Sequence, residues 1–461
     1  MPIAIDQARL GGLSDVRSGE VLQPEALWSA VSLRALKLSA LGLGPGARVL
    51  ISHGASLDFV IDLLAVWHLG ASAACLAPRM TEPERADVLA RLRPGFHLDG
   101  AGLDVCPDPL PAGQGEALIL FTSGTTGKPK GVVLSAVALE ERLALNRAHI
   151  PVDARMRTLC PLPTHFGHGL IGNLLTPLLD GGDVHLWPSP TLAELPDLAK
   201  IIDERRITFL SSVPTFWAIL RRLDAPRPRR ELARVQVGSA PLDPGLRSWV
   251  ANWSGTDRVI DMYGMTEAAN WIAGDPDGNG FHAWGGEIAI LQEGEAKQTG
   301  KGELVLRSSS LFDGYVGDPE ATRAALHRGW LRTGDLGEID DRGRIRLTGR
   351  LKTQITRAGI QISPERIEAL ILACPGVTGA ICFGYPDPIL GEAVALALTA
   401  EGGTADEAST DDLLGRAKVW ARARLMAEYL PDRWLLLPEL PLTDRGKPDR
   451  AAVRDVLKDR L

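Results

Sequence analysis

The segment from Leu118 to Gly131 constrains the fold more than any other part of this chain. It begins with an apolar run that predicts a buried strand, and it continues with glycines, hydroxyl side chains and two lysines. Glycine allows positive φ angles and a close approach of the backbone to a ligand, and successive backbone N–H groups in such a loop converge on an anion. The segment therefore predicts a loop that binds polyphosphate. The candidate contact residues are Thr122, Ser123, Gly124, Thr125, Thr126, Gly127 and Lys128.

This loop does not have the sequence of a Walker A loop. That pattern needs Gly-Lys followed by Ser or Thr, whereas Pro129 follows Lys128 here. Pro129 also prevents a helix from starting directly on the loop. A nucleotide-binding loop of another fold is therefore indicated, and a plain polar hairpin loop is the alternative.

Strand and helix patterns alternate on both sides of the loop. Arg48 to Ser52 predicts a strand, Leu57 to Leu69 a helix and Ala71 to Leu76 a second buried strand. This order favours a parallel sheet with crossover helices. Similar units continue to Ser211. They include predicted helices over 23–43, 82–93, 136–149, 169–179 and 192–205.

The pattern changes towards the C-terminus. From about Gly285, short alternating strands with glycine turns predict a small β-rich subdomain, and a compact α+β segment follows Arg350. A chain of 461 residues is also longer than a single core usually supports. We therefore predict an α/β protein with a large N-terminal domain of layered sheets and helices over 1–350, which includes the β-rich subdomain, and a small α+β domain over 351–461.

Composition excludes several classes of protein. The hydrophobic fraction of 45% and the charged fraction of 23% are those of a soluble globular protein. The net charge of −7 argues against nucleic acid as the principal partner. The five cysteines show no CxxC spacing, so neither a disulfide framework nor a zinc site is indicated. No signal pattern and no apolar run of membrane-spanning length occurs, and a cytoplasmic location is the expectation.

A second polar motif, Tyr263 to Glu267, follows the apolar strand residues Val259 and Ile260. An aromatic ring, a glycine and a carboxylate at a strand end suit a ligand crevice of an open α/β sheet. Tyr263 can stack on a purine, and the Glu267 carboxylate can hold Mg²⁺, which prefers oxygen ligands. An ordinary strand-to-turn sequence is the alternative.

These motifs together resemble the adenylate-forming superfamily, which includes acyl- and aryl-CoA synthetases, peptide-synthetase adenylation domains and beetle luciferases. The loop at 122–131 is similar to the signature loop of that superfamily, and the other motifs follow in the family's order. The resemblance implies an adenine pocket, a catalytic and magnesium-binding pair, and a ribose contact. The corresponding residues are Gly238, Ser239, Ala240, Tyr263 and Gly264 for adenine, Thr266 and Glu267 for catalysis and magnesium, and Asp335 for ribose.

The resemblance extends through the C-terminal segment, which it implies is a mobile domain. Arg350 would contact the ribose or the α-phosphate, and Lys352 would be the hinge. Gly359 would leave room for a pantetheine arm, although a β-hairpin turn is the alternative. Lys447, in a motif similar to the family's terminal lysine motif, would bridge the carboxylate and the α-phosphate.

The acid-binding residues are less well defined by the sequence. Pro161 to Leu170 resembles the segment that carries an aromatic gate, and either His165 or Phe166 is the gate; neither is assigned as a general base. Trp271 is expected to border the acyl pocket and to shorten it, which favours a small or aromatic acid. Trp271 as a core residue is the alternative.

The resemblance predicts an enzyme that uses ATP, Mg²⁺ and a thiol acceptor. Coenzyme A is the first choice of acceptor, and the phosphopantetheine of an acyl carrier protein is the alternative. Six arginines between Arg221 and Arg234 could dock either CoA phosphates or an acidic carrier, or could simply be solvated. No Asp lies between Cys160 and Thr176, which argues against an amino-acid-activating domain. An adenylate-binding protein without catalysis is the alternative of another class.

Overall fold

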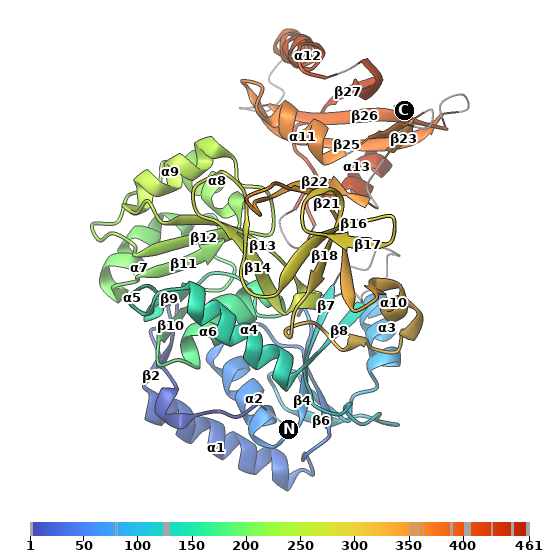
Figure 1. Cartoon of the computed structure of the whole chain (residues 1–461). Helices are drawn as coiled ribbons and strands as arrows, with labels where there is room; N and C mark the ends of the chain where they lie inside the picture. Colours follow the sequence, from blue (N-terminus) through green and yellow to red (C-terminus); the bar gives the residue numbers. More distant parts are fainter. Residues whose placement is uncertain are drawn as a thin grey trace. The chain divides into compact units, whose positions relative to one another are not determined.

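The computed structural model describes residues 3–78, 80, 82–122, 130–351, 355–357, 360–362, 364–387, 391–400, 407–425, 427–443 and 447–457. The chain divides into two compact units. The first comprises Met1–Ile288 and Leu306–Leu331, and the second comprises Ala289–Val305 and Arg332–Leu461. Both contain helices and strands (Figure 1), so the predicted α/β class is confirmed. No helix in the described ranges is both long and apolar enough to cross a membrane.

The phosphate-loop segment belongs to a seven-stranded sheet of the first unit. Its centre is parallel, as predicted, because helix α2 (Leu57–His68) crosses from one strand to the next with ten of its residues buried and Ser56 as its N-cap. The strands, in spatial order, are β19 (Gly314–Tyr315), β8 (Lys130–Ser135), β7 (Glu116–Thr122), β4 (Ser72–Cys75), β3 (Arg48–Ile51), β5 (Phe96–Leu98) and β6 (Leu103–Val105).

The second sheet of this unit has nine strands. Its central strands are parallel, so their carboxyl ends meet at one edge, where ligands bind in open α/β sheets. The spatial order is β15 (His282–Ala283), β14 (Asn270–Asp275), β13 (Val259–Met265), β12 (Arg234–Gly238), β11 (Phe209–Ser212), β9 (Arg157–Cys160), β10 (Asp183–Leu186), β1 (Leu13–Asp15) and β2 (Val21–Leu22).

The two faces of the nine-stranded sheet differ. One face carries an apolar core in which Val235 and Val237 pack with Trp217 and Trp253. Three helices contribute to this core and lie beside β11 and β12 in Figure 1. They are α7 (Leu198–Arg205), α8 (Pro214–Arg222) and α9 (Pro244–Ser254). The opposite face packs against a helix that carries part of the candidate site.

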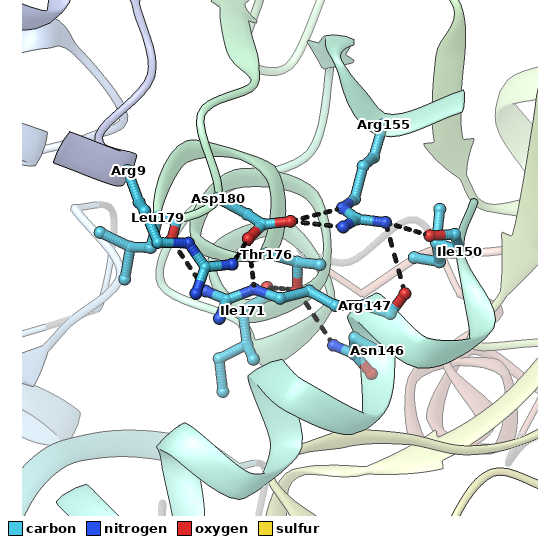
Figure 2. Close-up of polar contacts among 9 residues, drawn as sticks. All are labelled: Arg9, Asn146, Arg147, Ile150, Arg155, Ile171, Thr176, Leu179 and Asp180. Carbon is cyan, nitrogen blue, oxygen red and sulfur yellow. Dashed lines mark hydrogen bonds and ion pairs between the residues drawn. The ribbon is translucent and has the colours of Figure 1, made fainter. Parts of the chain in front are cut away.

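The helix predicted near 169–179 is present, but most of it is a π-helix. The structure has η2 (His168–Leu175), a π-helix, followed by the short α6 (Thr176–Leu178). The backbone N–H and the hydroxyl of Thr176 both donate to the Ile171 carbonyl, five residues earlier, and the amide of Asn146 donates to the Thr176 hydroxyl at 3.1 Å (Figure 2). These contacts favour the wider turn of a π-helix, a feature that often marks functional sites.

An ionic cluster forms around the buried carboxylate of Asp180, just after α6. The carboxylate of Asp180 accepts hydrogen bonds from Arg155 and Arg9, and Arg147 donates to the Leu179 carbonyl at 3.1 Å (Figure 2). Arg155 also donates to the Ile150 carbonyl. The cluster therefore joins the N-terminal segment, helix α4 (Ala136–His149) and the end of α6.

The remaining elements of the first unit lie outside the two sheets. They are α1 (Pro24–Ala40), α3 (Glu82–Leu92), α5 (Val152–Arg155), α10 (Pro319–Ala325), β20 (Leu326–His327) and the 3₁₀ turns η1 (Gln7–Arg9), η3 (Leu195–Asp197) and η4 (Thr266–Ala268).

The β-rich subdomain begins near Gly285, as predicted, and the division between the units falls within its strands. These strands are β16 (Glu287–Gln292), β17 (Glu295–Lys297), β18 (Gly300–Arg307), β21 (Trp330–Ile339) and β22 (Ile345–Arg350), and β20 of the first unit pairs with β21 in the same sheet. The expectation that a separate mobile domain begins after Arg350 stays a prediction.

The C-terminal part of the second unit is a sheet covered on both faces. Helices α11 (Pro364–Leu372) and α12 (Glu407–Arg422) pack on one face, and α13 (Arg450–Val456) packs on the other through Val453. The strands are β24 (Ile360–Ile362), β23 (Ile355–Arg357), β26 (Gly391–Ala400), β25 (Val377–Asp387) and β27 (Arg433–Leu436), and a 3₁₀ turn, η6, spans Ala427–Tyr429.

Candidate active site

The polyphosphate loop joins the two strands of an antiparallel hairpin. Thr122, at the end of β7, pairs with Lys130, at the start of β8. The hairpin alternative and the nucleotide-binding interpretation are therefore compatible. The other predicted loop residues, Ser123, Gly124, Thr125, Thr126, Gly127 and Lys128, lie outside the described residues.

Glu267 lies in the 3₁₀ turn η4 immediately after β13. Its side-chain Oε1 accepts a hydrogen bond of 2.8 Å from the phenol of Tyr315, and its carbonyl accepts one of 2.8 Å from the backbone N–H of Phe312. The ammonium of Lys130 lies 4.6 Å from the centre of the Tyr315 ring. Tyr315 therefore contacts both Glu267 and Lys130, the residue at the end of the phosphate loop.

The Tyr315 phenol is the donor in this contact. Burial raises its pKa well above the usual value, and the negative charge of Glu267 raises it further. The phenol therefore stays protonated and Glu267 stays the acceptor. Sequence reasoning missed Tyr315, because a Gly-Tyr pair 48 residues from Glu267 carries no local signal of this contact.

Arg142 of α4 holds the turn after Glu267 through hydrogen bonds. The Arg142 side chain is fully buried and donates to the carbonyls of Ala268 and Trp284, each at 3.2 Å, and to the Ser310 hydroxyl at 2.6 Å. Burial lowers its pKa to about 10. Sequence reasoning also missed Arg142, because an arginine in an amphipathic helix is usually a solvated residue.

The predicted adenine-contacting residues come from neighbouring strands. Gly238 ends β12, and a Cβ at this position would lie 3.0 Å from the Met262 carbonyl oxygen, one residue before Tyr263. A Cβ on Gly264 would lie 2.4 Å from the Asn270 carbonyl oxygen, so the close approach of β13 and β14 requires glycine there. Tyr263 is largely buried, and Ala240 follows in the turn after β12.

The predicted gate segment leads into the π-helix. The rings of His165 and Phe166 lie 4.0 Å apart, centre to centre. Two residues on, His168 has Nδ1 3.1 Å from the Ser239 hydroxyl and Nε2 2.7 Å from the Ser211 hydroxyl, so it links the ends of β11 and β12. Its ring meets that of Trp271 edge-on at 5.4 Å.

Trp271 is 2% exposed and belongs to an apolar cluster with Phe209, Ile260 and Met262. It therefore fits the core alternative, while its edge-on contact with His168 also places it beside the gate segment. Its predicted role in limiting the acid stays a prediction.

Thr266 and Glu267 offer the donor chemistry that magnesium prefers. The Glu267 carboxylate is half-buried, and only its Oε1 has a contact with another described residue. Among the described residues no three His, Cys, Asp or Glu side chains are grouped as a metal site. The Glu267 carboxylate therefore fits the oxygen-donor chemistry of Mg²⁺, and Glu267 would hold such an ion.

The second unit contains the predicted ribose-contacting pair. Asp335 is 4% exposed and accepts a hydrogen bond of 2.5 Å from Nε of Arg350, on the neighbouring strand. Its backbone N–H donates to the Thr333 hydroxyl at 3.0 Å, and Thr333 in turn donates to the Leu304 carbonyl at 2.7 Å. The Thr-Gly-Asp turn is therefore held by contacts within its own unit.

Lys447 has an exposed side chain in the second unit. Its carbonyl accepts a hydrogen bond of 2.7 Å from the backbone N–H of Thr443. Lys352 and Gly359 lie outside the described residues, although β23 and β24 pair on either side of Gly359.

The arginine cluster lies at the amino ends of the parallel strands of the nine-stranded sheet. Helix α8 starts after the carboxyl end of β11 and runs back, and β12 starts at Arg234 near the amino end of β11. Five of the arginines are exposed, whereas Arg234 is buried. The exposed members are Arg221, Arg222, Arg227, Arg229 and Arg230. The cluster is therefore remote from Gly238 and Glu267, at the carboxyl ends.

Known proteins resemble this chain over most of its length. The AMP-binding enzyme family model matches residues 97–316, and the AMP-binding enzyme C-terminal domain model matches residues 366–447. The oxalate–CoA ligase of Arabidopsis thaliana is 32% identical over 73% of this chain, and the match spans 66% of that protein, just under two thirds.

Two other similarities span nearly whole chains. The 4-chlorobenzoate–CoA ligase of an Arthrobacter species is 28% identical, over 96% of this chain and 92% of that protein. The crystal structure of an ATP-bound RpMatB-BxBclM chimera superposes with a TM-score of 0.84 and 25% identity, over 99% of this chain and 97% of the other. With both family models matched in order, the chain belongs to the adenylate-forming superfamily of AMP-binding enzymes.

Proposed function

We propose that this protein is an AMP-forming carboxylate–thiol ligase, which activates a carboxylic acid with ATP and transfers it to the thiol of coenzyme A. The observation that carries the proposal is the support around the residues assigned to the nucleotide. Glu267 is held by Tyr315 at a strand end, and Asp335 is held by Arg350 in a braced turn. The CoA ligases among the relatives support the same activity.

In the first step, a carboxylate oxygen of the acid attacks the α-phosphorus of ATP, the bond to the β-phosphate oxygen breaks, and pyrophosphate leaves. Lys447 would offset the charge that develops between the acid and the α-phosphate, and Asp335 would accept hydrogen bonds from the ribose. Magnesium bound by Glu267 would neutralise charge on the departing pyrophosphate. Catalysis then depends on positioning and charge stabilisation, with no protein nucleophile.

In the second step, the thiol sulfur attacks the acyl carbon of the adenylate. A thioester forms, the bond to the AMP phosphate oxygen breaks, and AMP leaves while the thiol proton passes to solvent. Coenzyme A is the proposed acceptor because relatives that span most of this chain are CoA ligases. The arginine cluster gives no support to a carrier protein as acceptor, since it lies at the edge of the sheet opposite Glu267.

The decisive experiment measures pyrophosphate release with ATP and Mg²⁺ across aryl, short, medium and long carboxylic acids, with and without coenzyme A. Release that depends on one acid and accelerates with coenzyme A, together with an acyl-CoA product detected by mass, would support the proposal. Acid-dependent release that ignores coenzyme A would indicate a carrier protein as the acceptor. Nucleotide binding without any acid-dependent release would indicate an adenylate-binding protein without catalysis.

A further inference from the structure

Three buried amide side chains, one in the π-helix and two on the strands that it faces, lack a full set of hydrogen bonds. In the part of the chain that the structure describes, ten buried side-chain nitrogen and oxygen atoms lack a partner. Four of the ten belong to Gln236, Asn173 and Asn270. This concentration needs an explanation, because the large majority of buried polar side-chain atoms in proteins are paired.

Gln236 is the most unusual of the three. It is fully buried on β12, and neither Oε1 nor Nε2 of its amide has a partner among the described residues. In the strand register it stands beside Ser211 and Ile260. Because neighbours in register point to the same side of a sheet, its amide lies on the face that carries the Ser211 hydroxyl. That hydroxyl is the one that contacts His168.

The other two amides lie along the same π-helix. Asn173 belongs to the π-helix and donates to the Ser211 carbonyl at 2.9 Å, while its Oδ1 is unpaired. Asn270 has an unpaired Nδ2 and a φ of 134°. A Cβ on Gly172 would lie 2.5 Å from that Nδ2, so the glycine lets the amide approach the π-helix. Donor and acceptor atoms therefore stand along one helix on one face of the sheet.

The position of this set relates it to the candidate site. Gln236 is two residues before Gly238, which corresponds to about 7 Å along a strand. That depth is comparable with one aromatic ring or a short aliphatic chain. Ile260 of the Trp271 cluster is a register neighbour of Gln236, and the Trp271 ring meets the His168 ring edge-on at 5.4 Å. A ligand that enters from the strand ends would therefore pass His168 and apolar side chains before it reaches the Gln236 amide.

We propose that Gln236, assisted by Asn173 and Asn270, recognises a hydrogen-bonding group at the far end of the acid. The substrate class is then a short or aryl carboxylic acid with a distal hydroxyl or carboxamide. The Gln236 amide presents both a donor and an acceptor, and a hydroxyl or carboxamide can satisfy both. A second carboxylate only accepts hydrogen bonds, so it would leave Oε1 unpaired. This inference rests on the proposed ligase function.

The activity test uses matched acids that differ only at the far end: benzoate, 4-hydroxybenzoate, 4-carbamoylbenzoate and terephthalate, and hexanoate, 6-hydroxyhexanoate and adipate. In wild-type protein, kcat/KM for acid-dependent pyrophosphate release should be at least about 10-fold higher for the hydroxyl or carboxamide acid than for its apolar counterpart, because a site built for a polar group rejects an analogue that lacks it. Gln236→Leu should remove this preference and leave KM for ATP unchanged. The matched control, Gln7→Leu, changes an exposed glutamine and should keep the preference.

A second measurement needs no substrate. If the Gln236 amide is unpaired in the free protein, Gln236→Leu should raise the melting temperature, by on the order of 1–2 °C, because the leucine buries no polar group. A lower melting temperature for Gln236→Leu would overturn the inference, and so would a preference for the dicarboxylates or an unchanged preference in the variant. If no acid in either series supports pyrophosphate release but another acid of the wider panel does, the inference fails and the ligase proposal stands. If no acid of any class supports release, both fail.

Discussion

The contact between Tyr315 and Glu267 gives the sharpest prediction about catalysis. Tyr315→Phe removes only the hydroxyl that donates 2.8 Å to the carboxylate, and it keeps the ring under the Lys130 ammonium. A hydrogen bond to a charged group contributes about 1.5–3 kcal/mol. If Glu267 holds the magnesium that serves the reaction, loss of this contact should lower kcat/KM for adenylation by roughly 10- to 150-fold. It should also raise the Mg²⁺ concentration needed for half-maximal rate.

The assay is acid-dependent exchange of pyrophosphate into ATP across a Mg²⁺ titration. Tyr385→Phe, which removes a phenol hydroxyl from the second unit, is the matched control and should leave both quantities unchanged. Equal Mg²⁺ dependence in wild type and Tyr315→Phe would refute the positioning role of the tyrosine. A loss of folding, detected by circular dichroism, would show instead that the hydroxyl matters for the structure.

Three further predictions concern stability, the π-helix and the lysine. Burial, with the positive charges of Arg157 and Arg205, lowers the pKa of His185 from 6.5 to about 4. Below pH 6.5 the unfolded chain binds a proton at His185, whereas the folded protein binds it only near pH 4. His185 therefore leaves the free energy of unfolding unchanged above pH 6.5 and lowers it by about 2 kcal/mol at pH 5. Between pH 7 and pH 5, the free energy of unfolding measured in urea should fall by about 2 kcal/mol less in His185→Gln than in wild type. An equal fall in both proteins would contradict the lowered pKa of His185. Thr176→Val, which removes the hydroxyl bound to the Ile171 carbonyl, should lower kcat/KM about 10-fold, whereas the equally buried control Thr158→Val should not; matching effects would exclude a specific role for the π-helix. Lys447→Ala should lower the adenylation rate by about 10²–10³ and spare thioester formation from a supplied acyl-adenylate; equal loss of both half-reactions would refute that division of labour.

Much of the fold could be predicted from local patterns. The strand expected from Arg48 to Ser52 is β3, and the helix expected from Leu57 to Leu69 is α2. These predictions succeed because the apolar runs are buried on both sides and Ser56 caps the helix. Alternation of strands and helices then favours parallel pairing, which the register of β3 and β4 shows.

The π-helix could not be predicted in this way. Its residues are apolar enough to favour a helix, but the wider turn depends on the Thr176 hydroxyl and on Asn146, which lies 30 residues earlier. The support of the Glu267 turn by Arg142 joins residues 126 positions apart. Local composition contains no signal for such pairings, because they form only when the layers pack.

The candidate site also contains residues that local sequence predicts and residues that it does not. The resemblance of the surrounding motifs to the adenylate-forming superfamily identifies Glu267, Asp335 and Lys447 as candidates. The residues that hold them, such as Tyr315, come from distant segments with ordinary sequences. Sequence reasoning therefore finds the candidates for chemistry and misses the groups that orient them.

Departures from ordinary folding rules occur at both ends of the parallel strands of the nine-stranded sheet. At the amino ends, five arginines are exposed, as charged side chains usually are, but Arg206 and Asp224 have positive φ values of 53° and 47°, and the buried Arg234 has an Nε without a partner among the described residues. At the carboxyl edge, Ser239, Ala269 and Asn270 have positive φ values of 69°, 57° and 134°. Backbone strain of this kind costs on the order of 1–3 kcal/mol for each residue. The same edge carries the unpaired Gln236 amide and the buried Arg142 guanidinium. Each of these departures lowers stability, wherever it lies. Those at the carboxyl ends stand next to Gly238 and Glu267, and this position argues that they are maintained for binding and chemistry.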